Sequence, residues 1–266
     1  MKARLDKFLV ERGLVPSRER AQALILAGRV LVNEQKVEKP GAAVAEDAAV
    51  RLLGDDLRYV SRGGLKLEAA LAHWHIDLSG RICADVGAST GGFTDCMLQH
   101  GAAAVVAIDT GYGQIAHKLR ADARVTLVER TNARHLQSQQ VALPVTFLAM
   151  DVSFISATLV LPAVVRAMPL LTEMVVLVKP QFEAGREHVG KGGIVRDAEA
   201  HRLAVERVRA AVAELGGESM EVIDSPLLGA EGNREFLLHA LWGMKRVSKS
   251  IGEDFGAFGS ISSSAT

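Results

Sequence analysis

The sequence predicts an α/β protein in which a small α+β domain precedes a domain with a mostly parallel sheet and helices on both faces. Three observations predict this architecture. The 266 residues suffice for one large α/β domain and a small partner domain. From Arg81 onward, apolar runs of strand length alternate with helical stretches, as in parallel sheets. A glycine-rich turn follows the first of these runs, where sheets of this class bind their ligands.

The composition indicates a globular protein and argues against an overall basic surface or a membrane-spanning segment. Hydrophobic residues make up 48% of the chain and charged residues 23%, as in a globular protein with a sizeable core. The formal net charge is zero, so any affinity for nucleic acid has to come from a local surface. The longest charge-free apolar stretch, Val152 to Val165, is shorter than the roughly 20 residues of a membrane-spanning helix. We therefore expect no membrane association.

The cysteines predict a reducing compartment. No secretory leader precedes Cys83 and Cys96, which lie within the alternating pattern, so we expect reduced thiols in a cytoplasmic protein. The histidines show no metal-ligand spacing with these cysteines. We expect no metal site.

The smaller domain comes first in the chain. A helical run at Leu5–Val10 leads into a turn, after which Ser17 is a suitable N-cap for a second helix. Short strands are expected at Val30–Asn33 and around Val37, on either side of a turn at Glu34–Gln35. These elements are sufficient for a compact unit of two helices and a few strands.

The same stretch carries a local positive charge. Between Lys2 and Lys36 there are eight basic and four acidic residues, and acidic residues further along cancel the excess. A basic face of this kind can bind RNA through one surface of a neutral protein. A solvated helix face explains the charge equally well, so charge alone does not decide.

A segment rich in Gly, Asp and Arg, from Gly54 to Gly64, is hinge-like and marks the domain boundary. From Met244 the chain becomes rich in Gly and Ser and loses its periodicity, as frayed termini do. The predicted organisation is a small domain at 1–58, a linker at 59–64, the large domain at 65–244 and a flexible tail at 245–266.

The large domain begins with a helix at Leu65–Leu71, and the alternating pattern follows it. The segments expected to form strands and helices in turn are Ile82–Val86, Thr94–His100, Ala103–Ile108, Ile115–Leu119, Val125–Val128, Val145–Met150, Leu159–Met168, Met174–Val178, Ala198–Leu215 and Phe236–Trp242.

The glycine-rich turn lies within Cys83–Asp95, which reads as a buried strand, a turn and a helix start. Glycines there permit a tight turn and let a ligand approach the backbone beside exposed helix amides. The spacing departs from the dinucleotide pattern G-x-G-x-x-G, because three other residues separate Gly87 from Gly91 and Gly92. The turn therefore predicts a ligand other than a dinucleotide, and a simple packing turn is the alternative.

Two polar residues follow the next strands. Asp109 ends the strand about 20 residues after the turn, where a carboxylate can accept hydrogen bonds from a ribose diol. Asn132 follows the next strand and could reach an adenine edge. A polar cap of the loop is an equally good interpretation of Asn132.

Four ionisable residues lie at informative places: Lys66, Asp151, Lys179 and Glu235. Asp151 and Lys179 each come directly after an apolar strand, and the carboxyl ends of parallel strands line the ligand crevice. Lys66 lies on the helix before the first strand, and Glu235 opens the last one. A solvated strand end explains any one of them, but the four together beside a glycine turn predict a reactive site.

The N-terminal strings Arg4-Leu5-Asp6-Lys7-Phe8-Leu9, Ser17-Arg18-Glu19-Arg20-Ala21, Gly28-Arg29-Val30 and Val32-Asn33 resemble the RNA-binding domain first described in the fourth small-subunit ribosomal protein. The resemblance implies that four guanidinium groups contact RNA phosphates, which suit their geometry. They belong to Arg4, Arg18, Arg20 and Arg29.

Four further strings resemble the haemolysin A (TlyA) family of ribosomal RNA methyltransferases: Asp85 to Asp95, Asp151 to Ser156, Leu177 to Glu183 and Gly232 to Phe236. This family is similar in its catalytic domain to the FtsJ-type ribose 2′-O-methyltransferases. The resemblance covers nearly the whole chain except the last twenty or so residues. It implies a Rossmann-like domain, S-adenosyl-L-methionine (AdoMet) as cofactor, and ribosomal RNA or ribosomal subunits as partners.

The resemblance also implies site residues. The catalytic tetrad carried over by motif is Lys66, Asp151, Lys179 and Glu235. The implied cofactor-binding residues are Asp85, Gly87, Ser89, Gly91, Gly92, Phe93, Asp109, Asn132 and Asp151. The turn has Ser89-Thr90 where FtsJ-type enzymes typically carry Ala-Pro, which favours the haemolysin A branch and leaves the glycines in place.

The implied chemistry is consistent with these residue types. A ribose hydroxyl is a poor nucleophile near neutral pH, so a base has to take its proton as the oxygen attacks the methyl group. We expect Lys179 to orient and deprotonate it, which requires a neutral amine. Desolvation and the neighbouring Lys66 favour that form, whereas Asp151 and Glu235 oppose it and hold the amines in place.

Other interpretations stay open at this stage. The family's historical name suggests a membrane-active haemolysin, and a non-catalytic RNA-binding or ribosome-assembly factor could keep the same fold. A nicotinamide oxidoreductase is a further alternative. The loop Glu183–Val195 has glycine hinges and basic residues, so it could close over RNA or be an ordinary surface loop.

Overall fold

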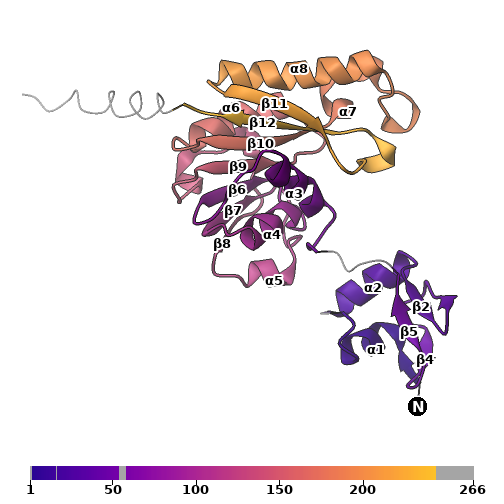
Figure 1. Ribbon diagram of the computed structural model, residues 1–266. Coiled ribbons are helices and arrows are strands. Elements are labelled where there is room, and N and C mark those ends of the chain that lie inside the picture. The colour runs from indigo at the N-terminus through magenta and orange to yellow at the C-terminus, as the bar shows by residue number, and fades with distance from the viewer. Residues whose placement is uncertain (1, 16, 54–57, 244–266) are drawn as a thin grey trace, which may run out of the picture. The chain divides into compact units, whose positions relative to one another are not determined.

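The computed structural model describes residues 2–15, 17–53 and 58–243, and it divides the chain into two compact units, Met1–Arg58 and Tyr59–Thr266 (Figure 1). The division falls inside the hinge-like segment predicted at Gly54–Gly64. The tail predicted to be flexible, 245–266, lies outside the described residues, as do 54–57 of the hinge.

The N-terminal unit is a small α+β fold. Its helices and strands are β1 (Lys2–Arg4), α1 (Leu5–Glu11), α2 (Arg18–Leu26), β2 (Val30–Val32), β3 (Gln35–Lys36), β4 (Ala43–Ala45) and β5 (Val50–Leu52). β1 pairs with β4, and a second antiparallel sheet has the order β3-β2-β5. Leu5, Leu9, Ile25 and Val30 are fully buried between the helices and strands. A small apolar core of this kind is what holds the unit together.

Two local predictions for this unit have different outcomes. The Ser17 hydroxyl accepts a hydrogen bond from the Arg20 backbone amide, which confirms Ser17 as the N-cap of α2. The hairpin turn is at Asn33–Glu34, one residue before the predicted position, and both residues have left-handed backbones with φ of 48° and 62°. Two such residues are what a tight two-residue hairpin needs, and asparagine tolerates this conformation better than most residues.

The second unit contains one seven-stranded sheet with the order β11-β12-β10-β9-β6-β7-β8 (Figure 1). The strands are β6 (Ile82–Val86), β7 (Ala104–Ile108), β8 (Val125–Val128), β9 (Phe147–Met150), β10 (Glu173–Val178), β11 (Glu218–Asp224) and β12 (Phe236–Leu241). The five strands from β10 to β8 are parallel, and β12 is antiparallel to both of its neighbours. The predicted mostly parallel sheet is confirmed.

Helices cover both faces of this sheet. They are α3 (Gly63–His73), α4 (Gly92–Gln99), α5 (His117–Arg120), α6 (Ala157–Ala167), α7 (Pro180–Glu183) and α8 (Ala198–Glu214). The core that contains α6 and α8 includes Val86 and Met150, whereas the core that contains α3 and α4 includes Cys83 and Ala149. Successive strand residues thus pack against opposite helix layers, as the period of two requires.

Strand β11 was not predicted from the sequence. It is an edge strand with an irregular register between Glu218 and Glu221, and Ser219 has a left-handed backbone with φ of 48°. A bulge breaks the alternation of apolar and polar residues that reveals a strand, and an edge strand buries little of its surface.

The direction of β12 determines which of its residues lies at the edge of the sheet where the parallel strands end. Because β12 is antiparallel to β10, Phe236 pairs with Val178, and Glu235 therefore lies beside Lys179. The parallel strands end at the same edge, where their loops begin.

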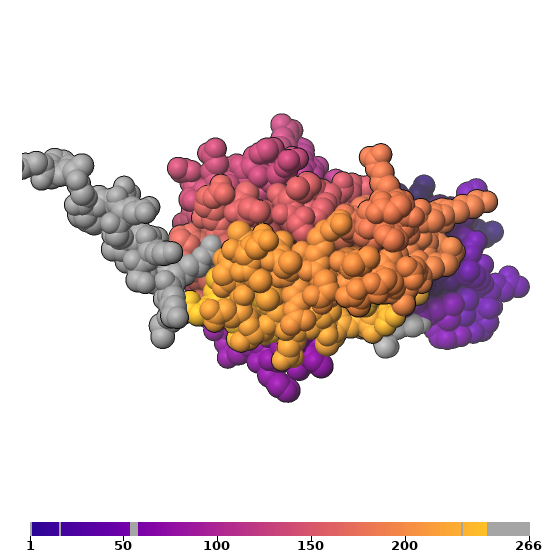
Figure 2. Space-filling view, turned by 90° about the horizontal axis from the view of Figure 1, so that it is seen from above, coloured from indigo at the N-terminus to yellow at the C-terminus, as the bar shows by residue number. Residues whose placement is uncertain are grey.

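Helix α8 lies on the surface of this unit, where Figure 2 shows its side chains in orange. Its core-facing residues include Ala204, Val208 and Val212, which are fully buried. No helix in the part of the chain that the structure describes is long and apolar enough to cross a membrane.

Candidate active site

The glycine turn lies at the point where the sheet order changes direction. β6 is flanked by β7 on one side and β9 on the other, and ligands of open parallel sheets bind in the crevice at such a point. Gly87 follows β6 with φ of 87°, and a Cβ there would lie 2.2 Å from the carbonyl oxygen of Asp151. Only glycine permits this approach of the two loops.

The next two glycines connect the turn to α4. Gly91 has φ of 92°, and a Cβ at this position would lie 2.3 Å from Leu119 Cδ1. Gly92 begins α4, where a Cβ would lie 2.3 Å from Ser61 Oγ. Gly92 lines the main cavity, but Gly91 lines neither cavity described below, so its contribution is to turn the backbone.

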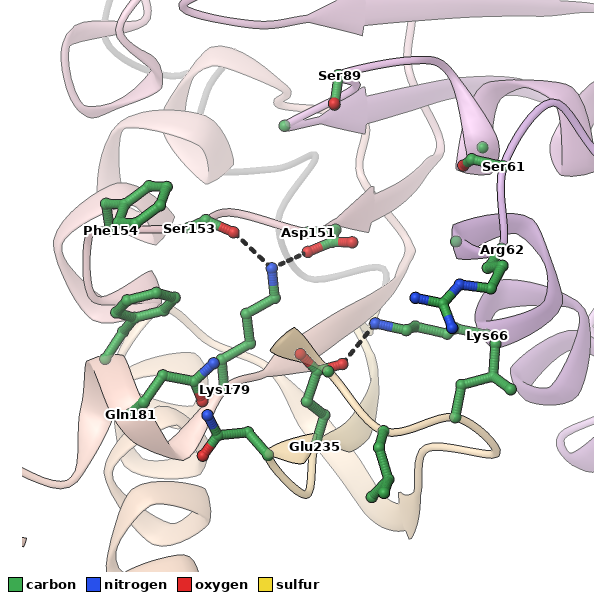
Figure 3. A pocket seen from close by; sticks show the side chains of 18 of the residues that line it. Ser61, Arg62, Lys66, Ser89, Asp151, Ser153, Phe154, Lys179, Gln181 and Glu235 are labelled. Atoms are coloured by element: carbon green, nitrogen blue, oxygen red, sulfur yellow. Dashed lines mark hydrogen bonds and ion pairs between the residues drawn. The ribbon is translucent and has the colours of Figure 1, made fainter. Parts of the chain in front are cut away.

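A cavity of about 570 Å³ opens beside this turn (Figure 3). A second cavity of about 430 Å³ shares Gly87, Ser89 and Asp151 with the first. Of the residues predicted to bind a cofactor, Asp85, Gly92 and Phe93 line the first cavity, and Asp109 and Asn132 line the second. The structure therefore brings eight of the nine to one continuous region.

All four residues of the predicted tetrad line the first cavity, and they form two ion pairs (Figure 3). Lys179 Nζ lies 2.5 Å from Asp151 Oδ1, and Lys66 Nζ lies 2.5 Å from Glu235 Oε2. Only 11% of the Lys179 side chain and 12% of the Lys66 side chain are exposed. Each amine is thus largely shielded from water and held by one carboxylate.

Glu235 is the most enclosed member of the tetrad, with 2% of its side chain exposed. A Cβ at residue 229 would lie 2.0 Å from Glu235 Oε1, so Gly229 leaves the space that this carboxylate occupies. Lys179 has an additional partner, because its Nζ donates a hydrogen bond of 2.7 Å to Ser153 Oγ. Ser153 was not among the site residues predicted from the sequence.

Asp85 has a buried oxygen that is available to a ligand. Its Oδ2 accepts hydrogen bonds from Thr94 N (2.8 Å) and Thr94 Oγ1 (2.6 Å), while Oδ1 is buried and has no partner among the described residues. Burial raises the pKa of this carboxyl to about 7, against the lowering effect of the Thr94 hydrogen bonds. A buried acceptor without a donor costs free energy, so this oxygen suits a cationic or N–H-bearing ligand group.

The carboxylate of Asp109 shapes the second cavity. Its Oδ2 accepts from Ser89 N at 2.8 Å, and its Oδ1 accepts from Gly111 N at 2.6 Å. These bonds tie the glycine turn to the end of β7. Asn132 also lines this cavity, and its Oδ1 accepts from Arg134 N at 3.0 Å. Asn132 thus forms the loop cap that was one of its two interpretations, and it remains within reach of the cavity.

The first cavity has further lining residues that were not predicted as site residues, among them Phe154, Gln181 and Arg62 (Figure 3). Phe154 is 93% exposed and has a left-handed backbone with φ of 64°, which is strained for an aromatic residue. Gln181 has a buried Oε1 without a hydrogen-bond partner in the described structure. Arg62 has no paired carboxylate among the described side chains. The strings around Asp151 and Lys179 contain the first two, but exposure and backbone strain appear only in three dimensions.

The loop at 183–195 contributes Val189, Gly192 and Gly193 to the cavity wall. Asn233 fixes its far end, because Oδ1 accepts from Val195 N (3.0 Å) and Nδ2 donates to the Gly193 carbonyl (2.9 Å). One end of the predicted loop is therefore anchored beside the tetrad.

The arginines predicted to contact RNA lie in the N-terminal unit, where each has at least one structural contact. Arg4 Nη2 and Arg18 Nε lie 2.9 and 3.0 Å from Oδ2 of the fully buried Asp6. Arg29 Nε donates to the Leu53 carbonyl at 2.8 Å. The side chains of Arg4 and Arg18 are still about half exposed, at 50% and 46%.

Other features of the second unit bear on possible ligands. Cys83 and Cys96 are both buried in the core beside α3 and α4. Within the described ranges, no three His, Cys, Asp or Glu side chains gather as they would around a metal ion.

The sheet, the glycine turn and the donor set define the class of an AdoMet-dependent methyltransferase domain. The close approach at Gly87 and the free Oδ1 of Asp85 fit a compact cationic cofactor at this turn. Comparisons with known proteins agree with this class. The FtsJ-like methyltransferase family matches residues 59–241, and the S4 domain matches residues 3–50.

Individual relatives match over most of their length. The 16S/23S rRNA (cytidine-2′-O)-methyltransferase TlyA of Mycobacterium tuberculosis is 46% identical over 238 residues, which cover 89% of each chain. Hemolysin A of Brachyspira hyodysenteriae is 40% identical, over 89% of this chain and 98% of that protein. The solved structure of a protein from Streptococcus thermophilus, named as a hemolysin, has a TM-score of 0.70 and 42% identity, over 91% of this chain and 89% of the other. The chain therefore belongs to the FtsJ-like methyltransferases, in the TlyA family, with an N-terminal S4 domain and AdoMet as its cofactor.

Proposed function

We propose that this protein transfers a methyl group from AdoMet to the ribose 2′-hydroxyl of a cytidine in ribosomal RNA. The observation that carries the proposal is the position of Lys179 Nζ, held between Asp151 and Ser153 in the cavity that also contains the glycine turn and the Lys66–Glu235 pair. The M. tuberculosis relative is named as a cytidine-2′-O-methyltransferase of 16S and 23S rRNA, which supports both the ribose position and the cytidine.

Cofactor binding falls to the residues around the turn. Bound AdoMet supplies a methyl group on a positively charged sulfur. Asp85 would accept hydrogen bonds from the cofactor's ammonium group through Oδ1, and Asp109 would accept them from the ribose diol. Gly87, Ser89, Gly92 and Phe93 would line the space between them, Gly91 would set the turn, and Asn132 would reach the adenine edge.

The tetrad then has to move one proton. The hydroxyl proton would pass to Lys179 Nζ as the 2′-oxygen takes the methyl group and the methyl–sulfur bond of the cofactor breaks. Asp151 and Ser153 aim that nitrogen, since both lie within hydrogen-bond distance of it. Lys66, held by Glu235, provides positive charge beside the reacting oxygen. Low exposure of both lysines keeps water from competing for these contacts.

The units divide the work in this proposal. The N-terminal unit, 1–58, would hold the RNA through Arg4, Arg18, Arg20 and Arg29, and the domain at 65–244 would carry out the chemistry after the 59–64 linker. Arg62 points toward Lys66 in Figure 3 and would meet a phosphate next to the target nucleotide. With ribosomal RNA as its substrate, the protein would act in the cytoplasm.

The test is methylation of small and large ribosomal subunits from cells that lack this gene, with labelled AdoMet, followed by mapping of 2′-O-methyl groups. The expected result is a new 2′-O-methylcytidine that Lys179→Ala protein does not produce. Label on a base, or none on either subunit or on free rRNA, would contradict the proposal. Release of dye from liposomes by the pure protein would instead support the membrane-active alternative.

A further inference from the structure

Glu183 is a buried carboxylate that lies outside the predicted tetrad. It ends α7, and only 2% of its surface is exposed. Its Oε2 accepts a 2.6 Å hydrogen bond from Ser156 Oγ, and its Oε1 accepts a 2.6 Å bond from Ala157 N. Burying a carboxylate is costly unless its oxygens are satisfied, and here both oxygens bond to the first turn of α6. Burial raises its pKa, and the bonds from Ser156 and Ala157 act against this rise.

The two partners of Glu183 lie at the end of the loop that carries Asp151 and Ser153. This loop connects β9 to α6 and includes the strained Phe154. At its start, Asp151 and Ser153 contact Lys179, and at its end Ser156 and Ala157 contact Glu183. A single helical turn, from Lys179 to Glu183, therefore contacts the 151–157 loop at both of its ends.

The strained backbone of Phe154 makes the contacts of Glu183 at the end of the loop necessary. A left-handed backbone at a residue with a bulky side chain costs of order 1–3 kcal/mol and persists only where its surroundings enforce it. If the end of the loop were released, Phe154 could relax, and Asp151 and Ser153 would move with it. A displacement of about 1 Å at a reacting group can cost on the order of a hundredfold in rate.

We infer that Glu183 is a positioning residue for methyl transfer, which fixes the 151–157 loop so that Asp151 and Ser153 stay aligned on Lys179. The inference rests on the proposed function for its kinetic consequence. Its structural content, that Glu183 holds the end of this loop, is independent of the reaction.

A matched control exists on β10, the strand that precedes α7. Glu173 begins β10, whereas Lys179 directly follows it, so about 16 Å of strand separates Glu173 from the active edge. Glu173 is also largely buried, and it lies 2.8 Å from His239 Nε2 and contacts Arg81. Glu173→Ala should therefore lower the melting temperature as Glu183→Ala does, without affecting the site.

The experiment measures kcat and KM for ribosomal subunits, the melting temperature, and hydrogen exchange of the 151–158 backbone in the full-length protein. For Glu183→Ala we expect kcat to fall about 30-fold, KM to change less than about threefold, and exchange in 151–158 to accelerate. Glu183→Gln should stay within about threefold of the original kcat, because its Oε1 can accept from Ala157 N and its Nε2 can donate to Ser156 Oγ. Ser156→Ala removes only one of the two hydrogen bonds to Glu183 and should disturb folding less than Glu183→Ala. We expect it to lower kcat about fivefold.

Equal losses of kcat in Glu183→Ala and Glu173→Ala would overturn the inference, because they would reflect stability alone. So would unchanged exchange at 151–158 in both Glu183→Ala and Ser156→Ala. If the original protein transfers no methyl group to any subunit, the proposed function fails, and the exchange measurement still decides whether Glu183 holds the loop.

Discussion

Both units use carboxylates to hold cations, but they hold different cations in different surroundings. In the N-terminal unit, one fully buried carboxylate, Asp6, contacts two arginines whose side chains are about half exposed. The hydrogen bond from Arg4, with those from Gln22 and Arg18, holds the pKa of Asp6 well below its usual range. In the tetrad of the second unit, two carboxylates hold one lysine each, and both lysines are nearly buried.

The difference matches two tasks. An arginine keeps its charge at any physiological pH and offers several donors at once, so a half-exposed pair suits a polyanion such as RNA. A lysine can lose its proton, and a site shielded from water lets neighbouring groups control when it does so. In the proposed function, the first arrangement presents positive charge to the RNA, and the second holds two amines away from water beside the reacting oxygen.

The strongest test of this distinction exchanges the cation type at Lys179. Lys179→Ala should lower kcat about a thousandfold, within the range of general acid–base contributions, and Lys179→Arg should be no better because a guanidinium does not accept the proton. Calorimetry should show that both variants bind AdoMet within about threefold of the original affinity. An arginine variant within tenfold of full activity would remove the distinction.

In the N-terminal unit, Asp6→Asn should release the two arginines from their fixed geometry. We expect affinity for a ribosomal RNA fragment at constant salt to fall about tenfold, with kcat at saturating RNA unchanged. Asp47→Asn removes the same charge from an exposed position and serves as the control. Tighter RNA binding by Asp6→Asn, as expected from the charge change alone, would show that Asp6 does not organise the arginines.

Asp85 links the comparison to pH. With its pKa raised to about 7, Asp85 is neutral in the unliganded fold below that pH, and its contribution to stability is lost as pH rises through about 7. AdoMet is a cation, so ionised Asp85 favours its binding. We expect the AdoMet Kd to fall roughly tenfold between pH 6 and pH 8.

Calorimetric titrations across this range test that expectation. In Asp85→Asn protein the dependence should flatten, and whatever slope persists belongs to the cofactor's own ionisation. An identical slope in both proteins would show that Asp85 does not respond to pH in the complex.

The smallest expected effect concerns an arginine in the catalytic unit. Arg62→Ala should raise the KM for ribosomal subunits about threefold and leave kcat unchanged, because a phosphate contact holds the RNA without taking part in the reaction. Arg166→Ala removes an exposed arginine from α6 and should leave KM as it is. A loss confined to kcat would assign Arg62 to the reaction itself. It would contradict the distinction between arginines that bind RNA and lysines that take part in the chemistry.

Local sequence patterns predicted much of this protein. The alternation after Arg81 predicted the parallel sheet, and Ser17 marked the start of α2. The positions of Asp151 and Lys179 directly after apolar strands predicted that both face the ligand crevice. These features depend on spacing, which a single sequence records, whereas Lys66 and Glu235 joined the predicted tetrad through the family resemblance.

Other features could not be predicted because they depend on contacts between distant segments. Nothing near Glu183 in the sequence indicates that its carboxylate caps α6, and nothing near Asp6 indicates that it is buried under two arginines. The bulge at Ser219 breaks the alternation of apolar and polar residues by which β11 would have been predicted. The hairpin turn lies at Asn33–Glu34, one residue before its predicted position, because both residues adopt a left-handed backbone.

The reversed direction of β12 has a consequence for how this chain tolerates length changes. Of the other residues of the tetrad, Lys66 lies on a helix, and Asp151 and Lys179 each follow a strand. Glu235 instead comes immediately before a strand, β12. An insertion between Asp224 and Glu235 that disturbs the register of Phe236 against Val178 would carry that carboxylate away from Lys66, even if the sheet itself formed normally. Natural variants of different lengths should therefore keep the spacing from Glu235 into β12 constant and place their extra residues earlier in the 225–234 segment.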